Sequence, residues 1–327
     1  MPQEINVEEW LCSISEKAQL AMLLDILTPK PGNVHRYKDH HDTRLVHFAA
    51  SIARLAHPIY QAARWGYQRN QSLQGPSKLG ELNKLALQAS MKPHRKNTLL
   101  GTILLIIPLT VAAGYEIPRP NWSPSTIRQS LSQILYQSSI DDALELIRTL
   151  QIANPGGAKP KTPQWTEESQ AFDFQSPRTI ELIRREKYTL IDLQSLAAPF
   201  DAIAEEYTTD FGYIFDQLYP RFLEALNQHS RVEDAVLISY LWALGQRPDT
   251  FIQRKAGPDA AQQVTKEAHK LHNRILHLPE DHWQKELNVF DDYLRSQGSR
   301  LNPGTTADLI SAAVFLALLL DRLKLIF

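Results

Sequence analysis

Nonpolar residues in this chain recur at steps of three and four, the spacing of one face of an α-helix. One such series is Leu45, Phe48, Ala49, Ile52, Leu55, Ala56, Ile59 and Ala63. Sustained alternation of polar and nonpolar residues between hairpin dipeptides, the usual signature of β-strands, is scarce. The pattern therefore predicts an all-α fold. We expect a single domain over residues 1–327 with about a dozen helices around a buried core.

Proline and glycine interrupt the helical pattern at several places. The stretch from Asn154 to Pro177 is the least regular, with four prolines and two adjacent glycines. The segments on either side are too nonpolar to stand alone as separate domains. We therefore interpret 154–177 as an irregular loop that faces the substrate rather than as a linker.

The charge balance argues against partners that are recruited by a global field. The chain has 35 basic and 36 acidic side chains, so neither nucleic acid nor an anionic membrane is expected to bind it. Its most nonpolar stretches, Ile103–Ala113 and Leu309–Leu320, are shorter than the roughly 20 residues that cross a bilayer. A single cysteine, Cys12, excludes an internal disulfide and is predicted to be buried. We expect a cytoplasmic protein without a signal peptide, and a homodimer is left open.

A stiff, cationic segment follows the first nonpolar run. Thr28-Pro29-Lys30-Pro31-Gly32-Asn33-Val34-His35-Arg36 combines two prolines and a glycine with Lys30, His35 and Arg36. A rigid backbone that presents amides and cations loses little entropy when it binds phosphate. The alternative interpretation is a helix end followed by a turn.

Two further segments place polar residues at helix starts. Asn97 or Thr98 could cap the helix that follows, whose amides would then face an anion. Thr305 and Asp308, three residues apart, resemble a capping box. Asp308 is also a carboxylate of the kind that magnesium takes together with phosphate oxygens. Each segment thus has a structural and a binding interpretation.

Two other groups carry carboxylates or histidines. His40, His41, Asp42 and His47 could bind a metal or phosphate, but they match no zinc spacing, and Asp42 could instead cap a helix. Asp201 and Glu205 share one helical face, which is by default a solvated acidic face.

Together, five segments resemble the triphosphoribosyl-dephospho-CoA synthase family in the order in which they occur, over nearly the whole chain. They are closest to the branch commonest in archaea. The segments are Thr28 to Arg36, Asn97-Thr98 with Gly101, Pro155-Gly156-Gly157, Phe200-Asp201-x-Ile203-Ala204-x-x-Tyr207 and Asn302 to Leu309.

The resemblance implies an all-helical enzyme that transfers the triphosphoribosyl group of ATP to the 2′-hydroxyl of 3′-dephospho-CoA and releases adenine. The substrates would be ATP with Mg²⁺ and dephospho-CoA or a related small-molecule acceptor. The substrate-binding residues it implies are Lys30, Asn33, His35, Arg36, Asn97, Thr98, Asn302, Thr305 and Thr306.

Within that set the resemblance suggests separate roles. Lys30, His35 and Arg36 would bind phosphate, and Asn97 and Thr98 would orient the ribose or the base. Asp308 and Asp201 would hold magnesium or stabilise the ribosyl cation. The base that activates the attacking hydroxyl would be one of Asp42, Asp173 or Asp308.

The chain also departs from the family pattern. Leu99 stands where relatives have a polar residue, Gln175-Ser176 replaces an acidic pair, and Ala158-Lys159 replaces Leu-Gly. Two alternatives follow. One is a sister transferase that assembles a one-carbon carrier of the tetrahydromethanopterin type, and the other is a nucleotide-binding homologue without turnover.

Overall fold

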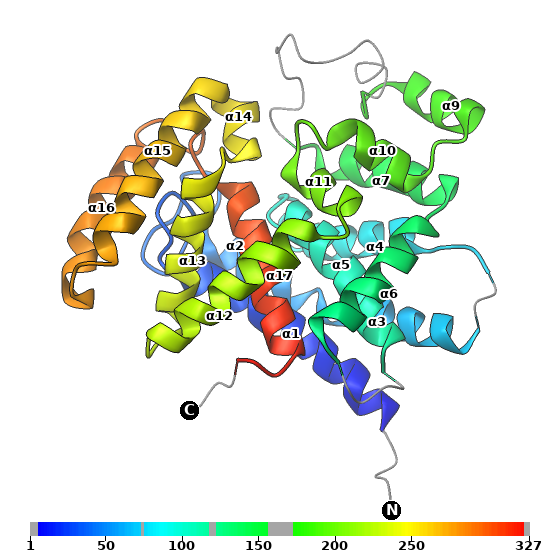
Figure 1. The fold of residues 1–327 in the computed structure, drawn as a ribbon. Coiled ribbons are helices and arrows are strands. Elements are labelled where there is room, and N and C mark those ends of the chain that lie inside the picture. Colours follow the sequence, from blue (N-terminus) through cyan, green and yellow to red (C-terminus); the bar gives the residue numbers. More distant parts are fainter. Residues whose placement is uncertain (1–5, 73–74, 118–121, 156–172, 324–327) are drawn as a thin grey trace, which may run out of the picture.

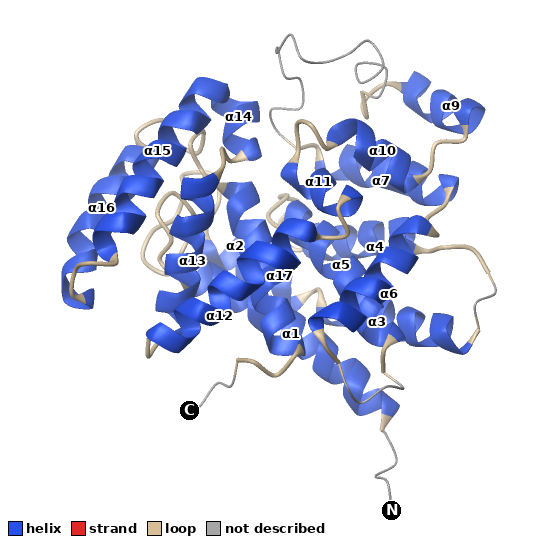
Figure 2. Cartoon of the chain, in the orientation of Figure 1, coloured by secondary structure: helices blue, strands red, loops and turns tan. Residues whose placement is uncertain are grey.

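Helices make up most of the described chain (Figure 2). The computed structural model describes residues 6–72, 75–117, 122–155 and 173–323, with the side chains of 280 and 281 left aside. Within these ranges there are sixteen α-helices and a π-helical segment, and no strand, so the all-α prediction is confirmed. The count exceeds the expected dozen because several helices, such as α11 and α14, have only seven residues.

The helices, in chain order, are α1 (Val7–Leu27), α2 (Leu45–Ala53), α3 (Ala56–Gln71), α4 (Leu79–Met91), α5 (Leu100–Tyr115), α6 (Pro124–Tyr136), α7 (Ile140–Ala153), α9 (Pro177–Glu186), α10 (Leu190–Ala197), α11 (Ala202–Thr208), the π-helical η1 (Ile214–Leu218), α12 (Tyr219–Gln228), α13 (Val232–Gln246), α14 (Thr250–Ala256), α15 (Pro258–Ile275), α16 (Glu280–Arg295) and α17 (Gly304–Leu319).

Many helices begin where local sequence rules place a start. The side chains of Ser123, Ser139 and Thr189 accept a hydrogen bond from the third amide of α6, α7 and α10. Pro124 and Pro258 occupy the first turns of α6 and α15, where a missing N–H costs nothing. These helix starts are determined by residues close in sequence, and for that reason the helices could be predicted.

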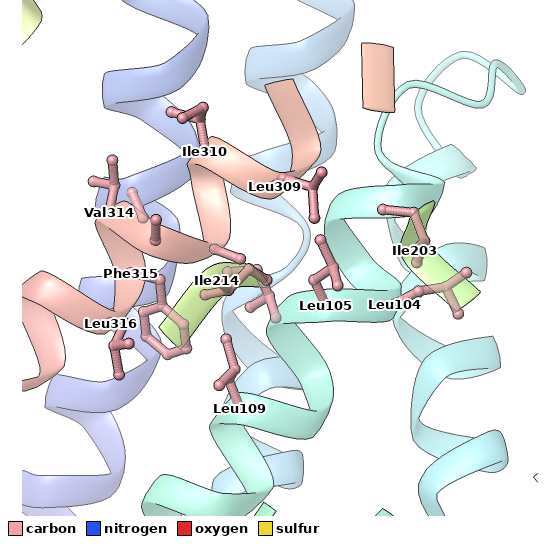
Figure 3. Close-up of a cluster of buried hydrophobic side chains, with 14 of the residues drawn as sticks. Leu104, Leu105, Leu109, Ile203, Ile214, Leu309, Ile310, Val314, Phe315 and Leu316 are labelled. Atoms are coloured by element: carbon pink, nitrogen blue, oxygen red, sulfur yellow. The ribbon is translucent and has the colours of Figure 1, made fainter. Parts of the chain in front are cut away.

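The centre of the core is formed by α5 and α17, whose residues are nonpolar on every side. Both helices are buried along almost their whole length. Figure 3 shows Leu105 and Leu109 of α5 close to Leu309 and Phe315 of α17. Phe315 is 0% exposed, and removing such a ring costs about 3–5 kcal/mol of folding free energy.

Helix α3 packs on α5 at very close range because two glycines lie at the crossing. A Cβ at Gly66 would collide with the carbonyl of Val111, and a Cβ at Gly114 would collide with the carbonyl of Ala63. The close crossing holds α5 in place, and the amino-terminal end of α5 carries part of the site described below.

The first and last helices of the described chain lie against each other. In Figure 1, α17 crosses the middle of the molecule beside α1, and the two helices pack directly. The loop that follows α1 therefore meets the loop that precedes α17. None of the described helices is both long and nonpolar enough to cross a membrane.

The structure differs from the sequence prediction at Cys12 and describes only the edges of the loop at 154–177. Cys12 is exposed on α1 rather than buried, because it falls on the outward side of that helix. Most of the loop expected at 154–177, including Ala158-Lys159, lies outside the described residues. At its edges, Asn154 ends α7 in a left-handed conformation and α9 begins at Pro177.

Candidate active site

A cavity of about 780 Å³ opens beside the amino-terminal ends of α5 and α17. This is the size of a site for a nucleotide-sized ligand. All five segments that the sequence singled out contribute to its wall. The lining comes from residues within 25–34, 40–48, 91–104, 146–155, 193–204, 251–255 and 299–308, together with Phe174.

The loop after α1 is held rigidly by side chains from distant helices. Asp291 of α16 accepts the amide of Gly32 at 2.8 Å, and the hydroxyl of Tyr240 donates to the carbonyl of Pro31 at 2.6 Å. Arg295 donates to the carbonyl of Asn33. None of these partners was identified from the sequence, since each lies more than 200 residues away.

The loops at the two ends of the chain are hydrogen-bonded to each other. The side-chain amide of Asn33 donates to the Oδ1 of Asn302 at 2.6 Å, across 269 residues. Gly32 has a φ of +82°, and a Cβ there would approach Leu294 and Pro303 to 2.8 Å. The glycine is thus required both by its conformation and by the close approach of the second loop.

Lys30 lies in the cavity wall as half of a buried ion pair. Its ammonium forms an ion pair with the Oδ1 of Asp25 at 2.8 Å and donates a hydrogen bond to the carbonyl of the same residue at 2.5 Å. Burial raises the pKa of Asp25, and Lys30 opposes that rise. Asp25 also lines the cavity but was not among the predicted residues. The charge of Lys30 is therefore already partly neutralised.

Asp308 faces the cavity from the first turns of α17, against the start of α5. Thr102 donates its hydroxyl to the Oδ1 of Asp308, and a Cβ on Gly101 would collide with the other carboxylate oxygen. The pKa of Asp308 is raised to about 7, chiefly by burial and also by the charges of Asp25 and Asp249, while hydrogen bonds from Thr102 oppose the rise. The group can therefore exchange a proton near neutral pH.

The capping box predicted for Thr305 and Asp308 is wrong. Helix α17 begins at Gly304, and its amide at Thr306 is bound at 2.7 Å by the buried carboxylate of Asp249. Asp249 also accepts the hydroxyl of Thr306 at 2.8 Å. A carboxylate distant in sequence has replaced the local cap, which leaves Asp308 free to point toward α5.

Asn97 and Thr98 both line the cavity just before α5. The Oδ1 of Asn97 accepts the amide of Leu100 at 3.2 Å, so it helps to cap the helix, which starts at Leu100. The hydroxyl of Thr98 lies 2.8 Å from that of Ser51. The departure Leu99, which follows Thr98, is buried in the cavity wall.

Asp201 lines the cavity, but both of its oxygens already have partners. Oδ1 accepts the amide of Ile203 at 2.8 Å and so caps α11. Oδ2 forms an ion pair with Arg254 at 2.6 Å. Glu205 pairs in turn with Arg247 at 2.7 Å. Asp201 is thus a cap and an ion-pair partner, not the exposed acidic group that the sequence suggested.

Asp42 lies exposed at the mouth of the cavity. It does not cap α2, because that helix starts at Leu45, whose amide is bound at 2.7 Å by Asp39. His40 lines the cavity and contacts the carbonyl of Gly32 at 3.0 Å. Across the described ranges, no group of three or more histidine, cysteine or acidic side chains is arranged to hold a metal.

Of the site residues that the resemblance implies, His35, Arg36, Asp173 and Thr306 do not line the cavity, and neither do His41 and His47. Burial lowers the pKa of His35 to about 4, with the charge of Asp291 opposing, so the ring is neutral at pH 7. Arg36 pairs with Glu233 at 3.4 Å. Asp173 accepts an amide two residues on, at 3.0 Å, in a turn before α9.

Cations that were not predicted do line the cavity. Arg95 and Lys96 precede α5, and Lys255 lies in the last turn of α14. In the part of the chain that the structure describes, Arg95 and Lys255 have no carboxylate partner within salt-bridge distance. Burial lowers the pKa of Lys255, while the charge of Asp42 raises it. In the sequence these residues appear only as basic residues beside a loop, a pattern too common to identify them as ligands.

Much of the remaining wall is nonpolar. Leu146 and Leu150 of α7, Leu193 of α10, and the rings of Phe174 and Phe200 contribute to it. The cavity thus combines cations and carboxylates with a surface suited to an aromatic base or an aliphatic chain.

Comparisons with known proteins give a consistent result. Residues 12–326 match the family described as ATP:dephospho-CoA triphosphoribosyl transferase. No curated protein matches. The chain is similar in fold to a crystal structure from Archaeoglobus fulgidus described as a triphosphoribosyl-dephospho-CoA synthase. The TM-score is 0.58 at 22% identity, and the match covers 83% of this chain and 98% of that one.

Proposed function

The chain belongs to the ATP:dephospho-CoA triphosphoribosyl transferase family, and from this premise we propose how its cavity carries out the reaction. The enzyme is a pentosyltransferase that moves the triphosphoribosyl group of ATP to the 2′-hydroxyl of 3′-dephospho-CoA and releases adenine. The single observation that carries the proposal is the meeting of the five family segments around one cavity, with Asp308 in its wall.

The triphosphate would be bound by the cations that line the cavity without a carboxylate partner. Arg95 and Lys255 meet that condition in the described ranges, and Lys96 lies next to Arg95. His35 is neutral and Arg36 is paired outside the cavity, so neither is assigned to phosphate any longer. Lys30 would act mainly by holding Asp25 in place.

Asp308 is the best placed of the three candidate bases. Asp42 is exposed at the cavity mouth and Asp173 does not line the cavity, whereas Asp308 is half-buried in its wall with a pKa of about 7. In the transfer, the electron pair of the bond between C1′ and adenine leaves with the base. The 2′-oxygen forms the new bond to C1′, Asp308 takes its proton, and adenine takes up a proton.

Charge builds on the ribose as the bond to adenine breaks, and carboxylates nearby would stabilise it. Asp25 and Asp308 both line the cavity, and the charge of Asp25 helps to raise the pKa of Asp308. The described residues offer no cage of three protein ligands, so magnesium fits as the magnesium complex of ATP, held largely by phosphate oxygens. Asp201 is no longer assigned to it, since both of its oxygens have partners.

The nonpolar wall from α7 and α10 would take an adenine base or the pantetheine arm of dephospho-CoA. We also propose that the enzyme works in the cytoplasm, where ATP is supplied. A homodimer, the one-carbon carrier as acceptor and a homologue without turnover all stay predictions, and the following assay addresses the last two.

The test is to incubate the purified protein with ATP, magnesium and dephospho-CoA and to measure adenine by chromatography. We expect adenine to appear in equal amount to the transferred product, and only when both substrates are present. The matched control is the 2′-deoxy form of dephospho-CoA, which lacks the attacking hydroxyl. ATP binding without adenine release would contradict the proposal and favour the alternatives.

A further inference from the structure

The side chain of Ser51, in α2, joins three parts of the molecule behind the cavity wall. Its hydroxyl oxygen lies 2.9 Å from the carbonyl of Ser90, 3.0 Å from the Nε2 of His94 and 2.8 Å from the hydroxyl of Thr98. Ser51 is 0% exposed, so these contacts and not water decide where its single hydrogen points.

That hydrogen belongs on the bond to Ser90. A carbonyl can only accept, and Ser90 lies in the last turn of α4, where carbonyls lack a partner within the helix. The amides that follow do not supply one, because Lys92 donates to Ala89 and both His94 and Arg95 donate to Met91. The hydroxyl of Ser51 therefore donates to Ser90 and has only lone pairs left for its other neighbours.

His94 is consistent with this assignment. Its Nδ1 accepts the amide of Lys96 at 3.1 Å, so that nitrogen carries no hydrogen. Its Nε2 lies 2.9 Å from the carbonyl of His47, so Nε2 must carry one. The ring is the Nε2–H tautomer and can donate toward Ser51 but cannot accept from it.

The direction of the last bond follows. Ser51 has already donated, so the short contact with Thr98 exists only if Thr98 donates to Ser51. Thr98 lines the cavity, and its hydroxyl hydrogen is turned away from any ligand. The hydroxyl of Thr98 is thus available to a ligand as a hydrogen-bond acceptor and not as a donor.

We propose that Thr98 is a specificity residue that accepts a hydrogen bond from a donor group of the ATP nucleoside, a ribose hydroxyl or the 6-amino group. Ser51 fixes that polarity as a positioning residue. The proposal rests on the proposed function in one respect, that the cavity binds ATP. It adds the direction of the hydrogen bond between Thr98 and the ligand. Ligand groups that can only accept a hydrogen bond are disfavoured next to Thr98.

The test measures binding and does not need turnover. Dissociation constants of ATP, 2′-deoxy-ATP, 3′-deoxy-ATP and the 6-deamino analogue would be measured by calorimetry for the wild type, Thr98→Ser and Thr98→Val. We expect one analogue to bind the wild type about tenfold more weakly than ATP. Thr98→Ser should keep this ratio and Thr98→Val should abolish it, and the affected analogue identifies the donor group.

Ser51→Ala provides a test of polarity. It frees the hydrogen of Thr98, so the hydroxyl can also donate. The penalty against an analogue with an acceptor at the identified position, inosine triphosphate for the base or the fluoro analogue for the sugar, should then shrink several-fold. In the wild type and Thr98→Ser the penalty should persist.

Equal analogue ratios in the wild type and Thr98→Val would overturn the proposal and leave Thr98 a structural residue. An unchanged penalty in Ser51→Ala would overturn the assigned direction. If the expected ratios are found but no adenine is released with dephospho-CoA, the proposed function fails while this inference stands.

Discussion

The pKa of the Asp308 carboxyl is determined by its surroundings in the fold. Burial raises the pKa of its carboxyl to about 7, and the hydroxyl of Thr102 is the main polar group that opposes the rise. Gly101 lets α5 approach the carboxylate so closely that no larger residue would fit there. One glycine and one threonine thus hold the proposed base against the cavity.

Asp308→Asn should lower the turnover rate by roughly 10² to 10⁴, because the amide cannot take a proton. Folding should be retained, since the amide oxygen can still accept from Thr102. In the wild type, turnover should fall as the pH drops through about 7, where the carboxylate becomes protonated. Adenine release as a function of pH, with thermal unfolding alongside, measures both effects.

Asp173→Asn is the matched control for Asp308→Asn. Asp173 was an equal candidate in the sequence but does not line the cavity. Its rate and pH profile should therefore stay close to those of the wild type. If Asp308→Asn kept the wild-type rate while Asp173→Asn lost it, the assignment of the base would be wrong.

At the scale of elements, the site is built where helices start or end. Arg95 and Lys96 precede α5, Lys255 lies near the end of α14, and Asp308 lies in the first turns of α17. At a helix end the backbone is held by the helix, while the side chain can point away from the helix into the cavity. They let cations from two separate elements line the same cavity.

Arg95→Gln and Lys255→Gln should each raise the KM for ATP about tenfold, because each removes a cation that lines the cavity and has no carboxylate partner among the described residues. The effect should weaken as salt concentration rises. Steady-state kinetics with ATP varied at saturating dephospho-CoA measure it.

Arg36→Gln provides the comparison, since Arg36 pairs with Glu233 away from the cavity. Its KM for ATP should be unchanged. A larger effect of Arg36→Gln than of the other two variants would return the phosphate role to the segment that the sequence first suggested.

The junction between α11 and the π-helical η1 contains a second buried acid. Glu206 is 0% exposed and accepts the amide of Ile214, the first residue of η1, at 3.2 Å. Burial raises its pKa from 4.5 to about 7, although Arg247 and the backbone bond oppose the rise. The folded chain therefore holds a proton on Glu206 that the unfolded chain loses above its ordinary pKa.

Because the pKa is raised on folding, Glu206 supports stability fully below about pH 4.5, and that support is lost as the pH rises through about 7. Glu206→Gln should remove this dependence. At pH 8 the variant should exceed the wild type by up to roughly 3 kcal/mol, with little gain at pH 5. Urea unfolding at both pH values measures the difference.

Glu205→Gln serves as the control for that experiment. Glu205 is partly exposed and paired with Arg247 at 2.7 Å, so its loss should bring no gain in stability at pH 8. An equal gain in both variants, or none in Glu206→Gln, would speak against a proton held on Glu206.

At the scale of the whole molecule, the fold was predictable from the sequence because its signals are local. The nonpolar spacing and caps such as Ser139 lie within a few residues of the helices that they specify. The family segments also located the cavity, since Lys30, Asn97 and Asp308 all line it.

What the sequence did not predict depends on contacts across the fold. Asp249 replaced the local cap of α17 from 57 residues away, and Asp291 holds Gly32 from 259 residues away. Arg36 was predicted to bind phosphate, but in the structure it forms an ion pair with Glu233. The choice between binding and pairing is made by neighbours in space, which neither spacing nor composition encodes.

ATP binding should stabilise the whole molecule, because the cavity wall draws on α5, α14 and both end loops at once. At about 100 times its dissociation constant, ATP should add about 2.7 kcal/mol to the free energy of unfolding. The melting temperature should rise by a few degrees, and Arg95→Gln should need more ATP for the same rise. The absence of any shift at saturating ATP would contradict binding to this cavity.

The hydrogen bond between Asn33 and Asn302 can form only late in synthesis of the chain. The loop that carries Lys30 is synthesised first, and its partner follows only after a further 269 residues have been added. A chain that stops before α17 lacks Asp308 and the contact that aligns the two loops. We therefore expect that a fragment which ends before α17 releases no adenine from ATP.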